Sequence, residues 1–341
     1  LIMGNRRIVL SGTGCSLIDY VYSGIDFNSP LFIKYMSHRP GDGGLHPGRL
    51  VFAKDLEQFA GKDFHSILSE LISNRNPDAA NIGGPCIVSL IHAAQLLNSN
   101  NFEVRFYGAS GDDETGHDLR KRLSKTPLDI QHYKVFHAED TPFTNVLSDP
   151  DYNNGAGERT FVNSIGAAWH YSPDDLDESF FYSDIVEFGG TALVPVIHDN
   201  LTYLLQKAKK HGCLTVVNTV YDFRNEQMNP GEKWPLGNHQ LSFSNIDLLL
   251  MDNEEALKIS GKQDVDSAAE YFRSLGVTAL MITQGRDEVI VWSDGSLFHP
   301  SGFYRLPISD KAVRELAVNN TRKGDTTGCG DGGHLYRGPA K

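Results

Sequence analysis

Residues 325–331 read Asp-Thr-Thr-Gly-Cys-Gly-Asp, ten residues before the end of the sequence. Gly328 and Gly330 leave the backbone nearly bare, so its N–H groups can approach an anion closely. If a helix begins here, these amides and the helix dipole form a phosphate-sized pocket. Asp331 then lies where a carboxylate can take a proton from a hydroxyl that attacks a phosphoryl group. The same residues also suit a turn and a helix cap, because Asp and Thr are good capping residues.

The composition is that of a globular protein with small-molecule partners. The 341 residues can bury a large core, and the hydrophobic content of 40% and charged content of 22% are ordinary. A net charge of −12 argues against nucleic acid or an anionic membrane as a general partner. No apolar run reaches the roughly 20 residues of a membrane span. We therefore expect no nucleic-acid and no membrane partner, while a local basic pocket for ATP remains compatible with the charge.

The cysteines predict a reducing compartment. They lie far apart in the sequence and form no Cys-x-x-Cys pair, which indicates free thiols and a cytoplasmic location. The four are Cys15, Cys86, Cys213 and Cys329.

The amino-terminal third alternates strand and turn patterns. A buried strand at 6–10 leads into Gly12-x-Gly14, which invites a dinucleotide-binding interpretation. The third glycine of that fingerprint is replaced by Leu17 and no helix pattern follows, so we reject a dehydrogenase. In residues 20–54, apolar and polar residues alternate and are interrupted by Gly and Pro. This pattern predicts strands and turns, and no helix. Residues 141–165 show the same pattern around a turn.

From about residue 184 the pattern becomes strand followed by helix, several times over. This repetition predicts a parallel sheet with right-handed crossovers. The expected strands cover residues 184–189, 214–220, 246–251, 279–283 and 289–292.

Two further motifs carry chemistry. Gly83-Gly84 ends a loop that feeds an apolar helix over 87–97, where bare backbone can lie against a ligand. Asp252-Asn253-Glu254-Glu255 begins another helix. The helix dipole favours carboxylates at a helix start. Carboxylates also suit the water shell of Mg²⁺, a cation that prefers hard oxygen ligands.

Together these motifs resemble those of the ribokinase-like (PfkB) carbohydrate kinases. Residues 325–331 are similar to the family's C-terminal signature Asp-Thr-Thr-Gly-Ala-Gly-Asp, with only Cys329 different. The Gly83-Gly84 loop and the Gly-x-x-Gly-Asp-Asp-x-x-Gly run at 108–116 resemble the first signature. The acidic helix start resembles the family's Asn-x-x-Glu motif. One departure is Val88, where the family commonly has Asn.

This resemblance implies a ribokinase-like three-layer α/β/α sandwich with a mostly parallel central sheet and a small β-sheet lid. The core would comprise residues 1–19, 55–140 and 166–341, and the lid residues 20–54 and 141–165. The implied activity is ATP-dependent transfer of the γ-phosphate to a hydroxyl of a carbohydrate, with lid closure excluding water.

The resemblance also assigns roles to residues. Asp331 is the implied base, and the amides that stabilise the transferred group are those of Gly328, Cys329 and Gly330. The sugar would be held by Asp19, Gly83 and Gly84. The nucleotide would be contacted by Thr283, Gly285 and Thr326. The water shell of magnesium would be organised by Glu255 and Asp252.

The implied cofactors are Mg²⁺, ATP as co-substrate and a monovalent cation, and the implied assembly is a homodimer through the lid. Two alternatives stay open: a nucleoside kinase on the same fold, which Val88 permits, and a catalytically silent sugar-binding or regulatory homologue. The family continues after Asp331 with apolar helices, whereas ten residues follow here. We expect that the printed sequence joins segments of the protein and omits residues between them, because a protein without those helices would expose a large apolar face.

Overall fold

The computed structural model describes residues 7–39, 41–97, 101–155, 157–238, 240–285, 288–299, 302–307 and 309. Within them the chain forms two main sheets and a short two-stranded ribbon of β6 (Ala109–Gly111) and β7 (Lys134–Phe136). None of the described helices is long and apolar enough to cross a bilayer.

The larger sheet has eight strands, of which six are parallel. Its order is β15-β14-β13-β12-β11-β10-β1-β5, and only the β13–β14 and β14–β15 pairs are antiparallel. Four of the strands predicted from residue 184 onward are confirmed as parallel, whereas the fifth, predicted at 289–292, is the antiparallel strand β14. In chain order the strands are β1 (Ile8–Gly14), β5 (Phe102–Tyr107), β10 (Ile185–Gly189), β11 (Leu214–Asn218), β12 (Leu248–Asp252), β13 (Ala279–Thr283), β14 (Val289–Ser293) and β15 (Gly302–Leu306).

Both faces of this sheet are covered. On one face Gly12 lies against Leu90 of helix α4 (Pro85–Leu96), where an added Cβ would come within 2.5 Å of the leucine. On the other face Phe188, which pairs with Thr13 in the neighbouring strand, packs on the ring of Phe180. The predicted α/β/α layering is therefore confirmed.

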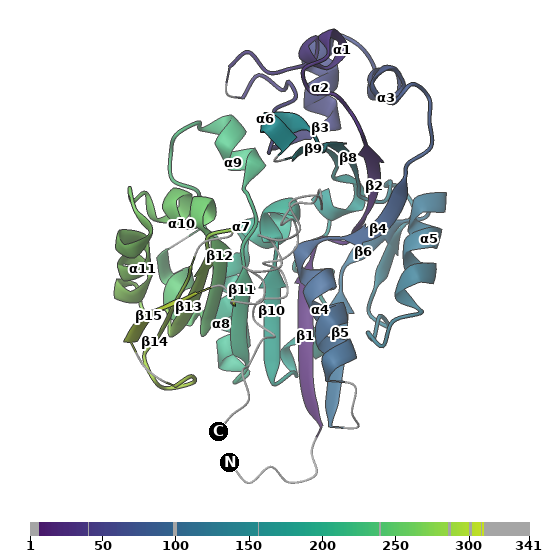
Figure 1. Ribbon diagram of the computed structural model, residues 1–341. Coiled ribbons are helices and arrows are strands. Elements are labelled where there is room, and N and C mark those ends of the chain that lie inside the picture. The colour runs from purple at the N-terminus through teal and green to yellow at the C-terminus, as the bar shows by residue number, and fades with distance from the viewer. Residues whose placement is uncertain are drawn as a thin grey trace.

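Further helices flank the sheet along its length (Figure 1). Helix α8 contacts β11, while α10 and α11 contact β12 and β13. Helix α5 is capped by Asp113, whose carboxylate accepts from the N–H of Gly116 at 2.7 Å. These helices are α5 (Glu114–Leu123), α7 (Pro195–Asp199), α8 (Leu201–Lys210), α10 (Asn253–Ser260) and α11 (Val265–Ser274), whereas α9 (Phe223–Met228) lies above the carboxyl edge of the sheet.

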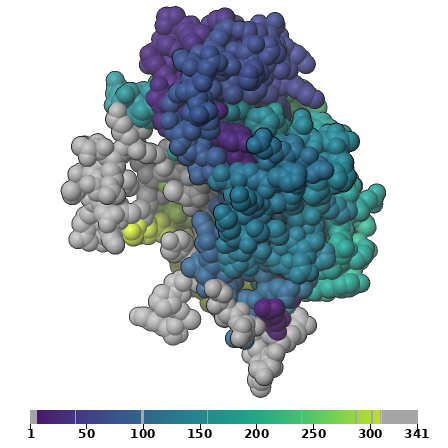
Figure 2. Space-filling view, turned by 90° about the vertical axis from the view of Figure 1, so that its right-hand side faces the viewer, coloured from purple at the N-terminus to yellow at the C-terminus, as the bar shows by residue number. Residues whose placement is uncertain are grey.

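The second sheet has five strands and lies beyond the carboxyl ends of the parallel strands (Figure 1). Its order is β3-β9-β8-β2-β4, so strands distant in sequence become neighbours. The strands are β2 (Leu17–Ser23), β3 (Leu50–Phe52), β4 (Ala79–Gly83), β8 (Phe143–Asp149) and β9 (Glu158–Ser164). With the helices packed on it, this sheet forms the upper lobe, which is drawn in purple and blue in Figure 2.

Three helices cover the outer face of the second sheet: α1 (Pro30–Ile33), α2 (Ala53–Ala60) and α3 (Phe64–Ile72). Buried residues such as Phe32, Leu56 and Ile67 form a cluster there with Leu147 and Val162 of the sheet. The expectation of no helix in residues 20–54 is thus wrong. Ser29 caps α1, and Pro30 follows it as the first helical residue. Ser-Pro is a signal for the start of a helix, but the surrounding apolar alternation favoured strands. The division into core and lid at the predicted boundaries stays a prediction.

Candidate active site

The carboxyl ends of β1, β10, β11, β12 and β13 form one edge that faces the second sheet. In open parallel sheets, ligands bind outside this edge. Two groups of the predicted residues lie along it. One group is at the end of β1, and the other is at the ends of β12 and β13.

The group beside β1 consists of Asp19, Gly83 and Gly84, which the structure brings together. A Cβ on Gly83 would lie only 2.3 Å from Asp19 Oδ2, so the carboxylate rests against the bare glycine. Gly84 has a φ of +110° and caps α4, and a Cβ there would meet the carbonyl oxygen of Cys15 at 2.2 Å. Burial raises the pKa of the Cys15 thiol to about 12, and the negative charge of Asp19 adds to the shift. Both glycines are thus required by close packing beside an acidic group.

The other group contains Asp252 and Glu255, which form a reciprocal helix cap. Asp252 Oδ1 accepts from the Glu255 N–H at 2.8 Å, and Glu255 Oε2 accepts from the Asp252 N–H at 3.0 Å. The hydroxyl of Thr219 also donates to Glu255 Oε2 at 2.6 Å. Glu255 is buried while Asp252 stays accessible to solvent. The sequence left open an acidic first helical turn beside the magnesium role, and the structure adds this reciprocal cap.

The surroundings of two carboxyls at this helix start, those of Asp252 and Glu254, favour the protonated form. Nearby protein removes water from Asp252 and raises the pKa of its carboxyl, although backbone N–H groups of Glu255 and Glu254 oppose the shift. Desolvation, followed by the charge of Asp252, raises the pKa of Glu254 as well. A bound cation would reverse both shifts, because an opposite charge favours the ionised carboxylate. Among the described residues no cluster of three metal-ligating side chains is found.

Thr283 and Gly285 extend this group to the next strand. Thr283 ends β13 directly opposite Asp252 in the register of β12 and β13. Gly285 has a φ of +61°, and no atom of the described residues lies within 4 Å of the place where its Cβ would be. The backbone here is open to a ligand.

The two groups are separated by the ends of β10 and β11. Three strand spacings divide β1 from β12, which is about 14 Å. The edge between them can accommodate an extended chain of phosphates. The predicted catalytic residues Asp331, Gly328, Cys329 and Gly330, and the predicted nucleotide contact Thr326, lie outside the described residues.

Comparison with known proteins identifies the family of this chain. The pattern of the pfkB family carbohydrate kinase matches residues 80–333. The chain belongs to the pfkB family of carbohydrate kinases. It is a kinase with the ribokinase fold, and membership implies ATP as co-substrate.

Solved structures with this fold include kinases of two substrate types. Adenosine kinase from Anopheles gambiae, in complex with P1,P4-di(adenosine-5) tetraphosphate, is 19% identical with a TM-score of 0.70, covering 96% of this chain and 88% of that chain. Adenosine kinase from Schistosoma mansoni with 2-fluoroadenosine is 16% identical with a TM-score of 0.71, covering 94% and 86%. A probable sugar kinase from Rhizobium etli CFN 42 is 17% identical with a TM-score of 0.66, covering 96% and 84%. At these identities the likeness shows the fold alone.

Two cavities of the pfkB kinase lie side by side between the second sheet and the core. One has a volume of 360 Å³ and the other of 560 Å³, and Phe52, Asp55 and Gln227 line both. The larger cavity is also lined by Asn163 and Trp169. Both volumes are in the range of small-molecule sites.

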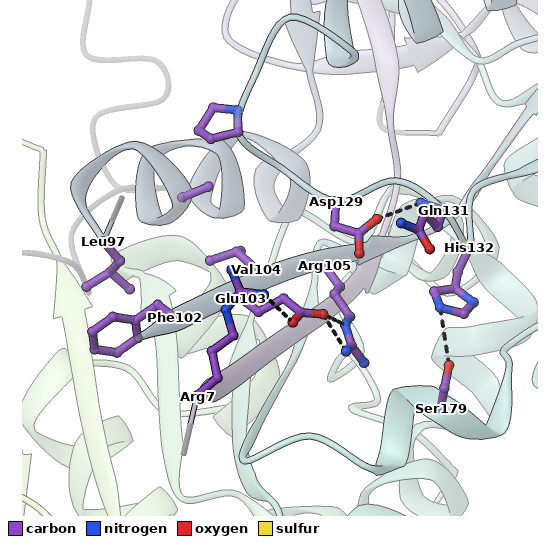
Figure 3. A pocket seen from close by; sticks show the side chains of 12 residues that line it. Arg7, Leu97, Phe102, Glu103, Val104, Arg105, Asp129, Gln131, His132 and Ser179 are labelled. Carbon is purple, nitrogen blue, oxygen red and sulfur yellow. Dashed lines mark hydrogen bonds and ion pairs between the residues drawn. The ribbon is translucent and has the colours of Figure 1, made fainter. Parts of the chain in front are cut away.

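A third cavity, of 680 Å³, lies away from this edge, near the start of β5 (Figure 3). Its charged groups are matched within the described chain: Arg7 and Arg105 both pair with Glu103. His132 stacks on the ring of Tyr107 and contacts Ser179 at 3.5 Å. We therefore do not assign this cavity to the kinase reaction.

Behind the edge lies a buried His198–Asp222 pair that the sequence analysis missed. His198 Nδ1 lies 2.9 Å from the Thr191 hydroxyl, and its Nε2 lies 3.1 Å from the Pro235 carbonyl and 3.5 Å from Asp222. Burial lowers the pKa of His198, and the Asp222 carboxylate opposes the shift. The pair ties α7 to the loop before α9, whose start Asp222 caps. Only the fold joins these residues, so no local pattern could have revealed them.

The predicted free thiols are confirmed for the described cysteines. Cys15, Cys86 and Cys213 are buried and form no disulfide. Cys329 lies outside the described residues.

Proposed function

We propose that this kinase transfers the γ-phosphoryl group of ATP to a hydroxyl of a carbohydrate. The observation that carries the proposal is the placement of Asp19 against Gly83, which Gly84 follows, at one end of the strand edge, with Asp252 and Thr283 at the other. The acceptor binds at the first group and the nucleotide at the second. The phosphates span the space between them.

Each acceptor-side residue has a physical role. The carboxylate of Asp19 accepts hydrogen bonds from two hydroxyls at once, which orients a polyol. Gly83 and Gly84 let the sugar approach the backbone, because no side chain intervenes.

The transfer step is assigned to the stretch at 325–331. Asp331 takes the proton of the attacking hydroxyl as general base. The amides of Gly328, Cys329 and Gly330 donate to the oxygens of the moving phosphoryl group, with Thr326 close to the nucleotide. Losing such donors typically costs about 10²–10³ in rate.

The acidic residues suit a magnesium ion that keeps most of its waters. Asp252 is solvent-accessible, and Glu255 is held in place by Thr219, so both can orient water ligands of the ion. Bound magnesium would neutralise charge on the phosphates. The carboxylates themselves keep the start of α10 ordered beside the nucleotide, where Thr283 and Gly285 leave the backbone open.

A nucleoside acceptor is the second candidate. Val88 replaces an amide side chain beside the acceptor position, and several solved structures with this fold are adenosine kinases. The discriminating experiment is ADP release from ATP with a panel of sugars and nucleosides. We expect ADP with at least one acceptor and a phosphorylated product by mass spectrometry. Ligand-induced thermal stabilisation without ADP from any acceptor would instead indicate a catalytically silent homologue.

The remaining implications of the resemblance stay predictions. These are a homodimer through the lid, a monovalent cation near the nucleotide, and a cytoplasmic location.

A further inference from the structure

A row of polar side chains crosses the inner face of the second sheet. Asp19 of β2 pairs with Thr144 of β8, and Thr144 pairs with Asn163 of β9. Directly paired residues point to the same side of a sheet. The acceptor-side carboxylate is therefore followed, strand by strand, by a hydroxyl and an amide.

The adjacent row shows which face this is. Tyr20, Asn145 and Val162 are paired with one another in the same way. Tyr20 and Val162 pack with the helices on the outer face. Because neighbouring residues of a strand alternate between faces, Asp19, Thr144 and Asn163 project from the opposite, inner face. Asn163 lies two strand spacings from Asp19, which is about 10 Å.

The side-chain amide of Asn163 has one hydrogen-bonding atom, Oδ1, without a partner among the described residues. Its Nδ2 donates to the Phe143 carbonyl at 3.3 Å and to the Thr144 hydroxyl at 3.0 Å. Because the Phe143 carbonyl can only accept a hydrogen bond, the amide atom that faces it must be the nitrogen of Asn163. Asn163 Oδ1 is buried and has no hydrogen-bond partner in the part of the chain that the structure describes. Such an oxygen is complementary to a donor from a ligand.

Asn163 also lines the 560 Å³ cavity, which has an aromatic wall. Trp169 ends a short helix directly after β9, and its side chain is 41% exposed. The indole ring offers a flat apolar surface on which a planar group can stack. An acceptor held only at Asp19 would leave this surface and the Asn163 oxygen unused.

We infer that Asn163 is a specificity-determining residue of the acceptor site. Its Oδ1 accepts a hydrogen bond from an N–H group on a planar, nucleobase-like part of the acceptor, which lies in the cavity beside Trp169. The sugar part lies at Asp19. The inference rests on the proposed function, because that function places the sugar hydroxyls at Asp19. It narrows the acceptor class to nucleosides that carry a ring amine.

The test uses the full chain and three probes: adenosine, purine riboside, which lacks the amine, and ribose. ADP release gives kcat/KM, and calorimetric titration without ATP gives the binding constant. We expect the unmodified protein to prefer adenosine over purine riboside by about tenfold, the worth of one neutral hydrogen bond. Asn163→Ala should abolish this preference and leave purine riboside unchanged.

The matched control is Asn145→Ala. Asn145 is also buried in the second sheet with an unpartnered amide nitrogen among the described residues, but it faces the outer helices. We expect this variant to keep the preference for adenosine. An equal loss in both variants, or an unchanged preference in Asn163→Ala, would overturn the inference.

The two readouts separate this inference from the proposed function. If ribose is phosphorylated while neither nucleoside binds, the inference fails and the kinase proposal stands. If adenosine binds with a preference that depends on Asn163 but no acceptor yields ADP, the kinase proposal fails and the inference stands.

Discussion

Gly83→Ala tests the acceptor site with a single methyl group. The added Cβ would lie 2.3 Å from Asp19 Oδ2 and 2.5 Å from Leu17 Cδ1, whereas ordinary contact begins near 3.4 Å. The carboxylate must therefore move by about 1 Å. Both neighbours are ends of flexible side chains, so the fold can absorb the change.

A displacement of about 1 Å in a group that orients the reacting partner can cost about 100-fold in rate. This corresponds to about 2.7 kcal/mol of transition-state stabilisation. We expect kcat/KM for the acceptor to fall by that factor, while KM for ATP and the melting temperature stay close to their original values. The nucleotide is unaffected because it binds three strands away.

The assay is steady-state ADP release with the acceptor varied, in a double-mutant cycle with Asp19→Ala. If Gly83→Ala acts through Asp19, it should add little to the loss already caused by Asp19→Ala. The reasoning is refuted if Gly83→Ala keeps its acceptor kcat/KM, or if it costs the same factor with and without the Asp19 carboxylate.

Three further predictions, one of them with a control variant, probe the surroundings. Gly84→Ala should destabilise the fold by at least about 1–3 kcal/mol, because φ is positive and the new Cβ meets the Cys15 carbonyl; a melting temperature equal to that of Gly83→Ala would contradict this. Asp252→Ala should cost about 1 kcal/mol by removing a helix cap and should also weaken magnesium-dependent ATP binding. Asp264→Ala, which removes the cap of α11, should cost similar stability without the binding defect; equal ATP titrations for both variants would exclude the metal role. The pKa of His198 is lowered by burial, so the unfolded chain takes up that proton first and stability falls as the pH drops below about 6.5. Thermal melting across pH 5–8 should show a shallower decline for His198→Gln, and parallel curves would contradict the assignment.

The locally encoded parts of the fold could be predicted from the sequence. The parallel strands β10 to β13 were predicted because each is a short apolar run followed by a helical pattern. The cap that Asp113 forms on α5 is also local, because a capping residue acts within one turn of chain. The sugar-binding role of Asp19, Gly83 and Gly84 came from the family resemblance and stays a prediction, while the structure shows the close contact of Asp19 with Gly83.

The parts that depend on tertiary register could not be predicted. Asn163, Thr144 and Asp19 come from three strands far apart in sequence, and only the order of the second sheet aligns them. The His198–Asp222 pair likewise joins a helix to a distant loop. The helix at Pro30–Ile33 was missed because one capped turn carries little periodicity.

The central claim is that Asp331 deprotonates a hydroxyl as it attacks the γ-phosphoryl group of ATP. The most direct measurement is turnover of Asp331→Asn against the unmodified chain, with ATP affinity determined in parallel. The account predicts a loss of about 10²–10⁴ in kcat, the usual range for a general base, with ATP affinity largely preserved. Near-normal turnover by Asp331→Asn would contradict it.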